Sequence, residues 1–293
     1  MRVHRRSFLA GLAAGCLHLP ESVRAQDVEP RLIREDYAVA RTHFRTRLQT
    51  FGPSPDEAPP LAPPSGPRTI GYRSGSLDLT AWISTDGGDR TPRPAVLFLH
   101  GGNALWPGHW DLAKPYLDAG YVVMMPALRA ENGLPGAFSG FYDETADVLA
   151  AAEHLRALPG IDAERLFLAG HSIGGTLTML AAMSTPVFRA AASFSGNPDA
   201  RAFFRRFPED VRFDTADPLE FDMRSAACFA GSFKCPVLML HASKEHSSDK
   251  TIRLTVERAR AAGLNVQRGV IDGDHGSALP GESAESLRFF AAL

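Results

Sequence analysis

Short apolar runs alternate with longer segments of helical periodicity along most of the chain. Compact apolar runs between turn residues are typical of buried strands, and apolar residues at three- and four-residue steps predict helices. Strands are expected at residues 69–72, 77–84, 95–99, 121–126, 166–169, 190–194, 236–240 and 266–271. Helices are expected at residues 27–51, 106–119, 142–158, 173–183, 250–262 and 283–292.

This order of elements predicts an α/β fold. Strands that alternate with helices favour a doubly wound, mostly parallel sheet with helices on both faces. The first two strands are separated by a short turn and predict an antiparallel pair. Residues 198–233 are rich in Phe and Arg and interrupt the alternation, so we expect a small helical cap insertion there, near the functional site.

Three segments are expected along the chain. Residues 1–25 have the pattern of a signal peptide. Residues 26–67 are expected to form an N-terminal helix followed by a linker, which is rich in proline at residues 51–67. A catalytic domain is expected over residues 68–293.

The first segment suggests export. An apolar stretch at residues 8–19, too short to span a bilayer, follows the pair Arg5-Arg6, and the pair with the following Ser-Phe-Leu resembles a twin-arginine signal. We therefore expect a periplasmic or secreted bacterial protein whose precursor uses the twin-arginine export machinery, with an ordinary Sec signal as the alternative. Lipidation at Cys16 is a further alternative.

Composition narrows the possible classes of protein. Apolar residues make up 44% of the chain and charged residues 22%, values typical of a soluble globular protein. The formal net charge of -2 gives no sign of nucleic-acid binding, and no apolar run is long enough for an integral membrane segment in the mature chain. Cys228 and Cys235 would form either a disulfide or two buried thiols.

A nucleophile motif lies between a predicted strand and a predicted helix. Gly170-His171-Ser172-Ile173-Gly174 matches the G-x-S-x-G pattern in the strand–turn–helix context that the motif requires. Glycines at both ends allow the tight turn that exposes the serine hydroxyl. We therefore expect Ser172 to be the nucleophile, and His171 to have a packing or hydrogen-bonding role nearby.

A serine hydroxyl needs a base, and the base needs an acidic partner. His275 lies in a Gly-rich loop after the last predicted strand, at the edge of the sheet where catalytic loops gather. The order Ser, acid, His places the acid after the strand at residues 236–240. Glu245 and Asp249 are the two candidates, and Asp249 could instead cap a helix that begins at residue 250.

The sequence also suggests an oxyanion hole and a substrate pocket. The amide of Gly102, followed in preference by that of Asn103, could bind a developing oxyanion together with the amide of Ile173. An apolar acyl or aryl pocket is expected from three cap residues, Phe203, Phe204 and Phe207. The arginines beside them are expected to be solvated: Arg201, Arg205 and Arg206. Neither a cofactor nor a metal is expected.

These motifs resemble those of the α/β-hydrolase superfamily, and especially of its prolyl-oligopeptidase and dienelactone-hydrolase branches. The resemblance covers residues 68–293 and includes features outside the motif: His100-Gly101-Gly102, Gly120-Tyr121-Val122-Val123, Arg129, Asp147 and Ile161-Asp162. It implies a nucleophile at Ser172, a base at His275 and an oxyanion loop at Gly102.

Two departures qualify the resemblance. Residues 1–67 leave no room for the β-propeller of prolyl oligopeptidases, and the family pattern His-Gly-x-x-Asp reads His241-Ala242-Ser243-Lys244-Glu245 here. The second departure favours Glu245 over Asp249, because Ser-His-Glu triads occur in this architecture.

The leading functional hypothesis is hydrolysis of a carboxylic ester through a serine-linked acyl-enzyme. A peptidase acting on short peptides or acylated amino acids is the second hypothesis. A non-catalytic binding protein on a hydrolase scaffold is the alternative from another class. The expected partner is thus a small ester or short peptide and not a nucleic acid.

Overall fold

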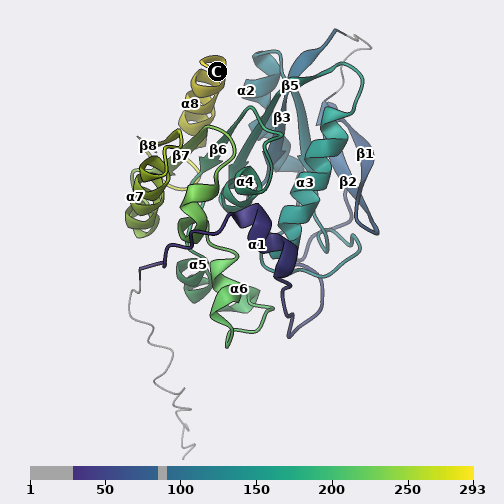
Figure 1. Cartoon of the computed structure of the whole chain (residues 1–293). Helices are drawn as coiled ribbons and strands as arrows, with labels where there is room; N and C mark the ends of the chain where they lie inside the picture. Colours follow the sequence, from purple (N-terminus) through teal and green to yellow (C-terminus); the bar gives the residue numbers. More distant parts are fainter. Residues whose placement is uncertain (1–28, 85–90) are drawn as a thin grey trace, which may run out of the picture.

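An eight-stranded, mostly parallel sheet forms the centre of the molecule (Figure 1). The structure is a computed structural model that describes residues 29–84 and 91–293. The predicted signal peptide, with Arg5, Arg6 and Cys16, therefore lies outside the described residues. No helix in the described part of the chain is long and apolar enough to cross a membrane.

The sheet follows the order β1-β2-β4-β3-β5-β6-β7-β8. The first two pairs in this order, β1-β2 and β2-β4, are antiparallel, and the other pairs are parallel. The strands are β1 (Pro67–Ser74), β2 (Leu77–Ser84), β3 (Arg93–Leu99), β4 (Val122–Pro126), β5 (Ile161–His171), β6 (Ala190–Phe194), β7 (Val237–Ala242) and β8 (Val266–Ile271). The predicted fold class is confirmed.

Helices cover both faces of the sheet, as Figure 1 shows. The α-helices are α1 (Tyr37–His43), α2 (Lys114–Asp118), α3 (Tyr142–Arg156), α4 (Ile173–Ser184), α5 (Ala200–Arg206), α6 (Pro218–Asp222), α7 (His246–Ala261) and α8 (Leu279–Ala291). Short 3-10 helices are η2 (Pro107–Ala113), η3 (Pro208–Asp210) and η4 (Ala226–Ser232).

Side chains of the central strands alternate between two hydrophobic cores. In β3, Leu97 and Leu99 belong to the core beneath α3 and α4, whereas Val96 and Phe98 belong to the core beneath α2 and α8. A strand points successive side chains to opposite faces, so a strand buried on both faces is apolar at every position. This explains why β3 appears in the sequence as a continuous apolar run.

The predicted N-terminal helix over residues 27–51 is wrong in extent. Asp36 caps α1 through its side chain, and the helix ends at His43 because Phe44 has extended backbone angles. The chain beyond Phe44 pairs with the cap, where Leu48 and Phe213 form an antiparallel bridge. This tertiary pairing outweighs the helical periodicity of the apolar residues.

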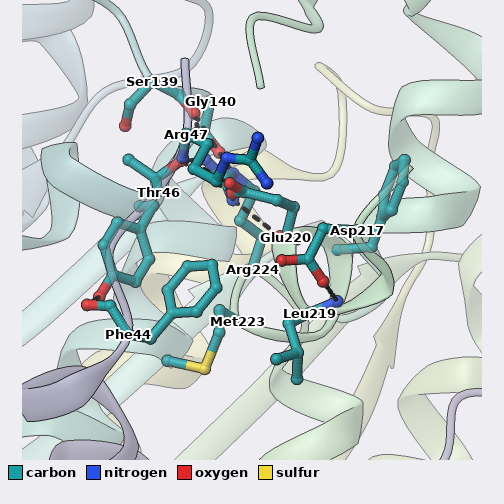
Figure 2. Close-up of polar contacts among 12 residues, drawn as sticks. Phe44, Thr46, Arg47, Ser139, Gly140, Asp217, Leu219, Glu220, Met223 and Arg224 are labelled. Atoms are coloured by element: carbon teal, nitrogen blue, oxygen red, sulfur yellow. Dashed lines mark hydrogen bonds and ion pairs between the residues drawn. The ribbon is translucent and has the colours of Figure 1, made fainter. Parts of the chain in front are cut away.

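A buried arginine joins the N-terminal segment to the cap (Figure 2). Arg224 is fully buried, and its Nη1 donates to Glu220 Oε2 at 2.6 Å. Its Nη2 donates to Thr46 Oγ1 at 2.7 Å, and its Nε donates to the carbonyl of Gly140 at 2.7 Å. The guanidinium also lies 3.9 Å from the centre of the Phe213 ring. One side chain thus connects three distant segments.

Glu220 completes this connection from the other side. Its carboxylate accepts hydrogen bonds from the Arg47 amide at 2.5 Å and the Thr46 hydroxyl at 2.8 Å, as drawn in Figure 2. The buried charge of Arg224 is therefore neutralised and fully hydrogen-bonded, which is the condition under which a buried ion pair is tolerated.

Replacing Arg224 should strongly destabilise the fold. Arg224→Met leaves the Glu220 carboxylate buried without its cation, and we expect the free energy of unfolding to fall by about 3–5 kcal/mol in denaturant titrations. Arg224→Met combined with Glu220→Leu should recover part of this loss. Lys114→Gln, which removes an exposed ion pair with Asp118, serves as the control and should change little. A near-parental stability for Arg224→Met would contradict the structural role.

Candidate active site

Ser172 lies on the sharp turn between β5 and α4. Its backbone has φ 56° and ψ −117°, and its amide donates to the Phe194 carbonyl at 2.8 Å. A Cβ at Gly170 would clash with the Gly174 carbonyl, and a Cβ at Gly174 would clash with the Leu99 carbonyl. Both glycines are therefore required sterically, and the strained turn holds the serine clear of the sheet.

His275 and Glu245 form a hydrogen-bonded pair. The loop between β8 and α8 carries His275, and Glu245 stands directly before α7. His275 Nδ1 lies 2.6 Å from Glu245 Oε1, and this hydrogen bond raises the pKa of His275. Burial would raise the pKa of Glu245, but the hydrogen bond and the charge of His275 lower it below its ordinary value. A carboxylate so placed fixes the ring orientation and favours the charged imidazole.

Asp249 lies in a different set of contacts. It is one turn inside α7, which begins at His246, so the expectation that Asp249 caps this helix is wrong. Its carboxylate lies 3.2 Å from His241 Nε2, 3.2 Å from Arg253 and 3.3 Å from Arg268. Of the two candidate acids, only Glu245 contacts His275.

The Ser172 side chain shares a pocket with the His275–Glu245 pair. Among the described residues, no hydrogen bond joins the Ser172 hydroxyl to the imidazole. Proton transfer between them would therefore need a small rotation of the serine or the ring, a common adjustment between free and substrate-bound states. His171 instead points its Nε2 to the His275 carbonyl at 2.9 Å, which fits the supporting role expected of it.

The loop after β3 lies beside Ser172. Gly102 has φ +73°, a conformation that favours glycine, and it lines a small cavity with Ile173. Ile173 is the first residue of α4, so the helix itself supplies no acceptor for its amide. The Asn103 amide donates to Asp56 Oδ2 at 2.7 Å, so in this structure that predicted oxyanion donor is already engaged.

A cavity of about 580 Å³ opens over Ser172 and is bounded on one side by α5. Phe203 and Phe207 line it as expected. Phe204 does not: it is 3% exposed and packs against Phe141 and Phe213 in the core. The seven-residue α5 can direct only part of its aromatic side chains to the cavity.

Of the three cap arginines expected to be solvated, Arg201 is the exception. It donates to the buried Asp222 at 2.6 Å and to the Pro218 carbonyl at 2.9 Å. Arg205 and Arg206 are exposed and line the cavity beside Ser172. The pocket wall is therefore aromatic and basic at the same time.

Two polar residues that the sequence analysis missed lie next to Glu245. Ser195, which also lines the cavity, donates its hydroxyl to Glu282 Oε1 at 3.1 Å. Glu282 is fully buried at the start of α8, and burial together with the nearby Glu245 charge raises its pKa to about 7. Its only signal in the sequence is an acidic residue in the first turn of a helix, which is common on protein surfaces.

The cysteines and the possible metal ligands among the described residues form no further site. Cys228 and Cys235 are free and buried, so the disulfide alternative is wrong, and burial raises the pKa of both thiols to about 12. No group of three or more His, Cys, Asp or Glu residues suited to a metal ion occurs in the described part of the chain.

The chain is similar to known proteins in part of its sequence and in its fold. The model of the prolyl oligopeptidase family, Peptidase_S9, matches residues 111–249. No curated protein sequence matches the chain.

Solved structures share the fold at low sequence identity. An acylaminoacyl peptidase from Pyrococcus horikoshii has a TM-score of 0.60 and 20% identity, covering 76% of this chain and 40% of its own. Dipeptidyl peptidase 4 from Porphyromonas gingivalis has a TM-score of 0.65 and 21% identity, covering 77% and 35%. A dienelactone hydrolase from Klebsiella pneumoniae has a TM-score of 0.58 and 20% identity, covering 78% and 100%.

The fold is that of the α/β-hydrolase superfamily, and the family match to residues 111–249 supports a serine hydrolase. Within that superfamily the chain is similar to the prolyl oligopeptidase and dienelactone hydrolase branches. It spans about 40% of the length of the acylaminoacyl peptidases that it matches.

Glu282 should make stability depend on pH. Its pKa is about 7 in the folded protein against an ordinary value of 4.5, so the folded state binds this proton more tightly. That stabilisation is fully present below about pH 4.5 and is lost as pH rises through about 7. The unfolding free energy of the parent minus that of Glu282→Gln should therefore fall by on the order of 3 kcal/mol between pH 4.5 and 8.

Denaturant titrations across this pH range measure the difference directly. Buried carboxyls that do not interact with Glu282, such as Glu144, affect parent and variant equally and cancel. Glu285→Gln, on the exposed side of α8, should show a nearly constant difference instead. A constant difference for Glu282→Gln as well would show that Glu282 does not carry a raised pKa.

Proposed function

We propose that this protein hydrolyses an acyl bond of a small substrate through a covalent intermediate on Ser172. The contact between His275 Nδ1 and Glu245, in the cavity that holds the nucleophile, carries this proposal. It provides an oriented base whose charged form is stabilised, which is what a serine hydroxyl needs for attack.

The proposed reaction follows from these positions. The Ser172 hydroxyl attacks the substrate carbonyl carbon while His275 Nε2 takes its proton. The amides of Gly102 and Ile173 donate to the resulting oxyanion, and protonated His275 gives its proton to the leaving group. Water, deprotonated by His275, then attacks the acyl-enzyme, and the proton returns to Ser172 as the acid product leaves.

Amide bonds of short peptides or acylated amino acids are the proposed substrates. The family match supports this choice, as do the acylaminoacyl peptidase and dipeptidyl peptidase folds. Carboxylic ester hydrolysis, expected first from the sequence, is the second candidate. It is supported by the dienelactone hydrolase, whose full length this chain covers.

Export is a separate part of the proposal and rests on the sequence alone. The Arg5-Arg6 pair and the apolar segment after it support translocation by the twin-arginine machinery and a periplasmic or secreted location.

Removing the nucleophile should abolish covalent labelling. A fluorophosphonate probe should label the parent protein, and Ser172→Ala should show no labelling and a loss of several orders of magnitude in kcat for N-acylaminoacyl amides and aryl esters, because the catalytic residues act as a unit. Ser184→Ala, at the far end of α4, is the control and should keep its labelling. Absence of labelling in a folded parent would favour a binding protein over an enzyme.

The acid should be distinguishable by a paired substitution. Glu245→Gln removes the charge that orients His275, and we expect kcat to fall by about 10²–10⁴-fold with little change in Tm. Asp249→Asn weakens surface ion pairs with two arginines and should leave kcat near the parental value. Measurements of kcat and Tm on both variants decide the question. A large loss of turnover in Asp249→Asn alone would reverse the assignment.

A further inference from the structure

The cavity over Ser172 has a basic wall. Two arginines line it, Arg205 and Arg206, and the one carboxylate among its described lining residues is Glu245. That carboxylate already accepts a hydrogen bond from His275 at 2.6 Å. The remaining polar lining consists of neutral hydroxyl and amide groups, including Ser195 and Asn197. A substrate entering the cavity therefore meets the guanidinium of Arg206.

Arg206 is the arginine that is open to a ligand. Within the described part of the chain its guanidinium forms no hydrogen bond or ion pair with an acidic side chain, and it lies 5.4 Å from the centre of the Phe207 ring. A ring beneath a guanidinium limits its orientations while leaving its five donors available. The charge also lies close enough to the base to oppose protonation of His275.

The helix dipole could explain why a basic residue, Arg206, lies at the end of α5, but it does not explain why Arg206 faces the cavity. Basic residues at a helix C-terminus interact favourably with the helix dipole wherever they lie around the helix. Arg206 is on the side that faces the cavity, whereas Arg201 of the same helix is paired with the buried Asp222. The helix dipole does not require the cationic side to face the nucleophile.

We propose that Arg206 binds a carboxylate carried by the substrate, so that this hydrolase prefers acidic substrates. The inference rests on the proposed function and specifies its substrate class. Guanidinium groups bind carboxylates through paired, charge-assisted hydrogen bonds, and the aromatic wall formed by Phe203 and Phe207 covers the apolar part of the same substrate.

The carboxylate could belong to the acyl part or to the leaving group, and two substrate pairs separate these sources. The acyl pair is mono-4-nitrophenyl glutarate and 4-nitrophenyl pentanoate, which have acyl chains of equal length. The leaving-group pair is N-acetyl-Ala-Ala with a free carboxylate and its C-terminal amide. In each pair the readout is the ratio of kcat/KM for the acidic substrate to kcat/KM for the neutral one.

For at least one pair, this ratio should fall about ten- to a hundredfold in Arg206→Gln, the range expected for a lost hydrogen bond to a charged group. Arg206→Lys should retain a larger part of the ratio, because it keeps the charge. In the parent, raising the ionic strength should also lower the ratio, because Arg206 is exposed to solvent. Arg73→Gln removes an exposed charge outside the cavity and should leave the ratio unchanged.

The outcomes separate this inference from the proposed function. A ratio unchanged in Arg206→Gln and insensitive to salt, in both substrate pairs, would overturn the inference while hydrolysis itself stands. No turnover of any substrate together with no fluorophosphonate labelling would overturn the proposed function. If Arg206→Gln fails to fold, the salt dependence of the parent ratio remains a decisive test.

Discussion

The buried ion pair between Arg224 and Glu220 holds together the parts of the molecule that shape the cavity. Its guanidinium reaches the loop before α3, the N-terminal segment and the cap, as Figure 2 shows. The cap in turn carries α5, which forms one wall of the cavity over Ser172. An ion pair in this position adds little net stability over an apolar replacement, but it requires one arrangement of donors and acceptors. The shape of the cavity thus depends on a contact at some distance from the reacting atoms.

Two carboxyl groups of opposite behaviour lie around Ser195. Glu245 has a lowered pKa because His275 donates to it, whereas Glu282 has a pKa raised to about 7 by burial and by the Glu245 charge. Two close carboxylates resist simultaneous ionisation, so the charge on Glu245 favours the protonated form of Glu282. Below about pH 7, where Glu282 is mostly protonated, Glu245 is the main negative charge beside His275. The charge beside His275 therefore depends partly on the ionisation of Glu282, a residue that does not contact His275.

The sequence was sufficient for the fold class because strand burial leaves a direct pattern: β6 and β8 have the bounds predicted for them. The G-x-S-x-G motif was enough to predict Ser172, and the position of His275 after the last strand was enough to predict His275. Predictions failed where tertiary contacts decide, as for residues 44–51, which pair with the cap, and for Phe204, whose side of α5 faces the core. Glu282 was not predicted because burial of a single polar residue leaves no periodic pattern in the sequence.

The docking of the first described helix has a consequence for biosynthesis. The Tyr37 hydroxyl donates to the Met223 carbonyl, and the Tyr37 amide donates to Ser232 across a separation of 195 residues. A ribosome makes these partners late, so α1 emerges long before its binding surface exists. Closing such long loops is entropically costly and slow, and the apolar side of the early segment stays exposed meanwhile. The nascent chain should therefore depend on chaperone protection until most of the cap has been translated.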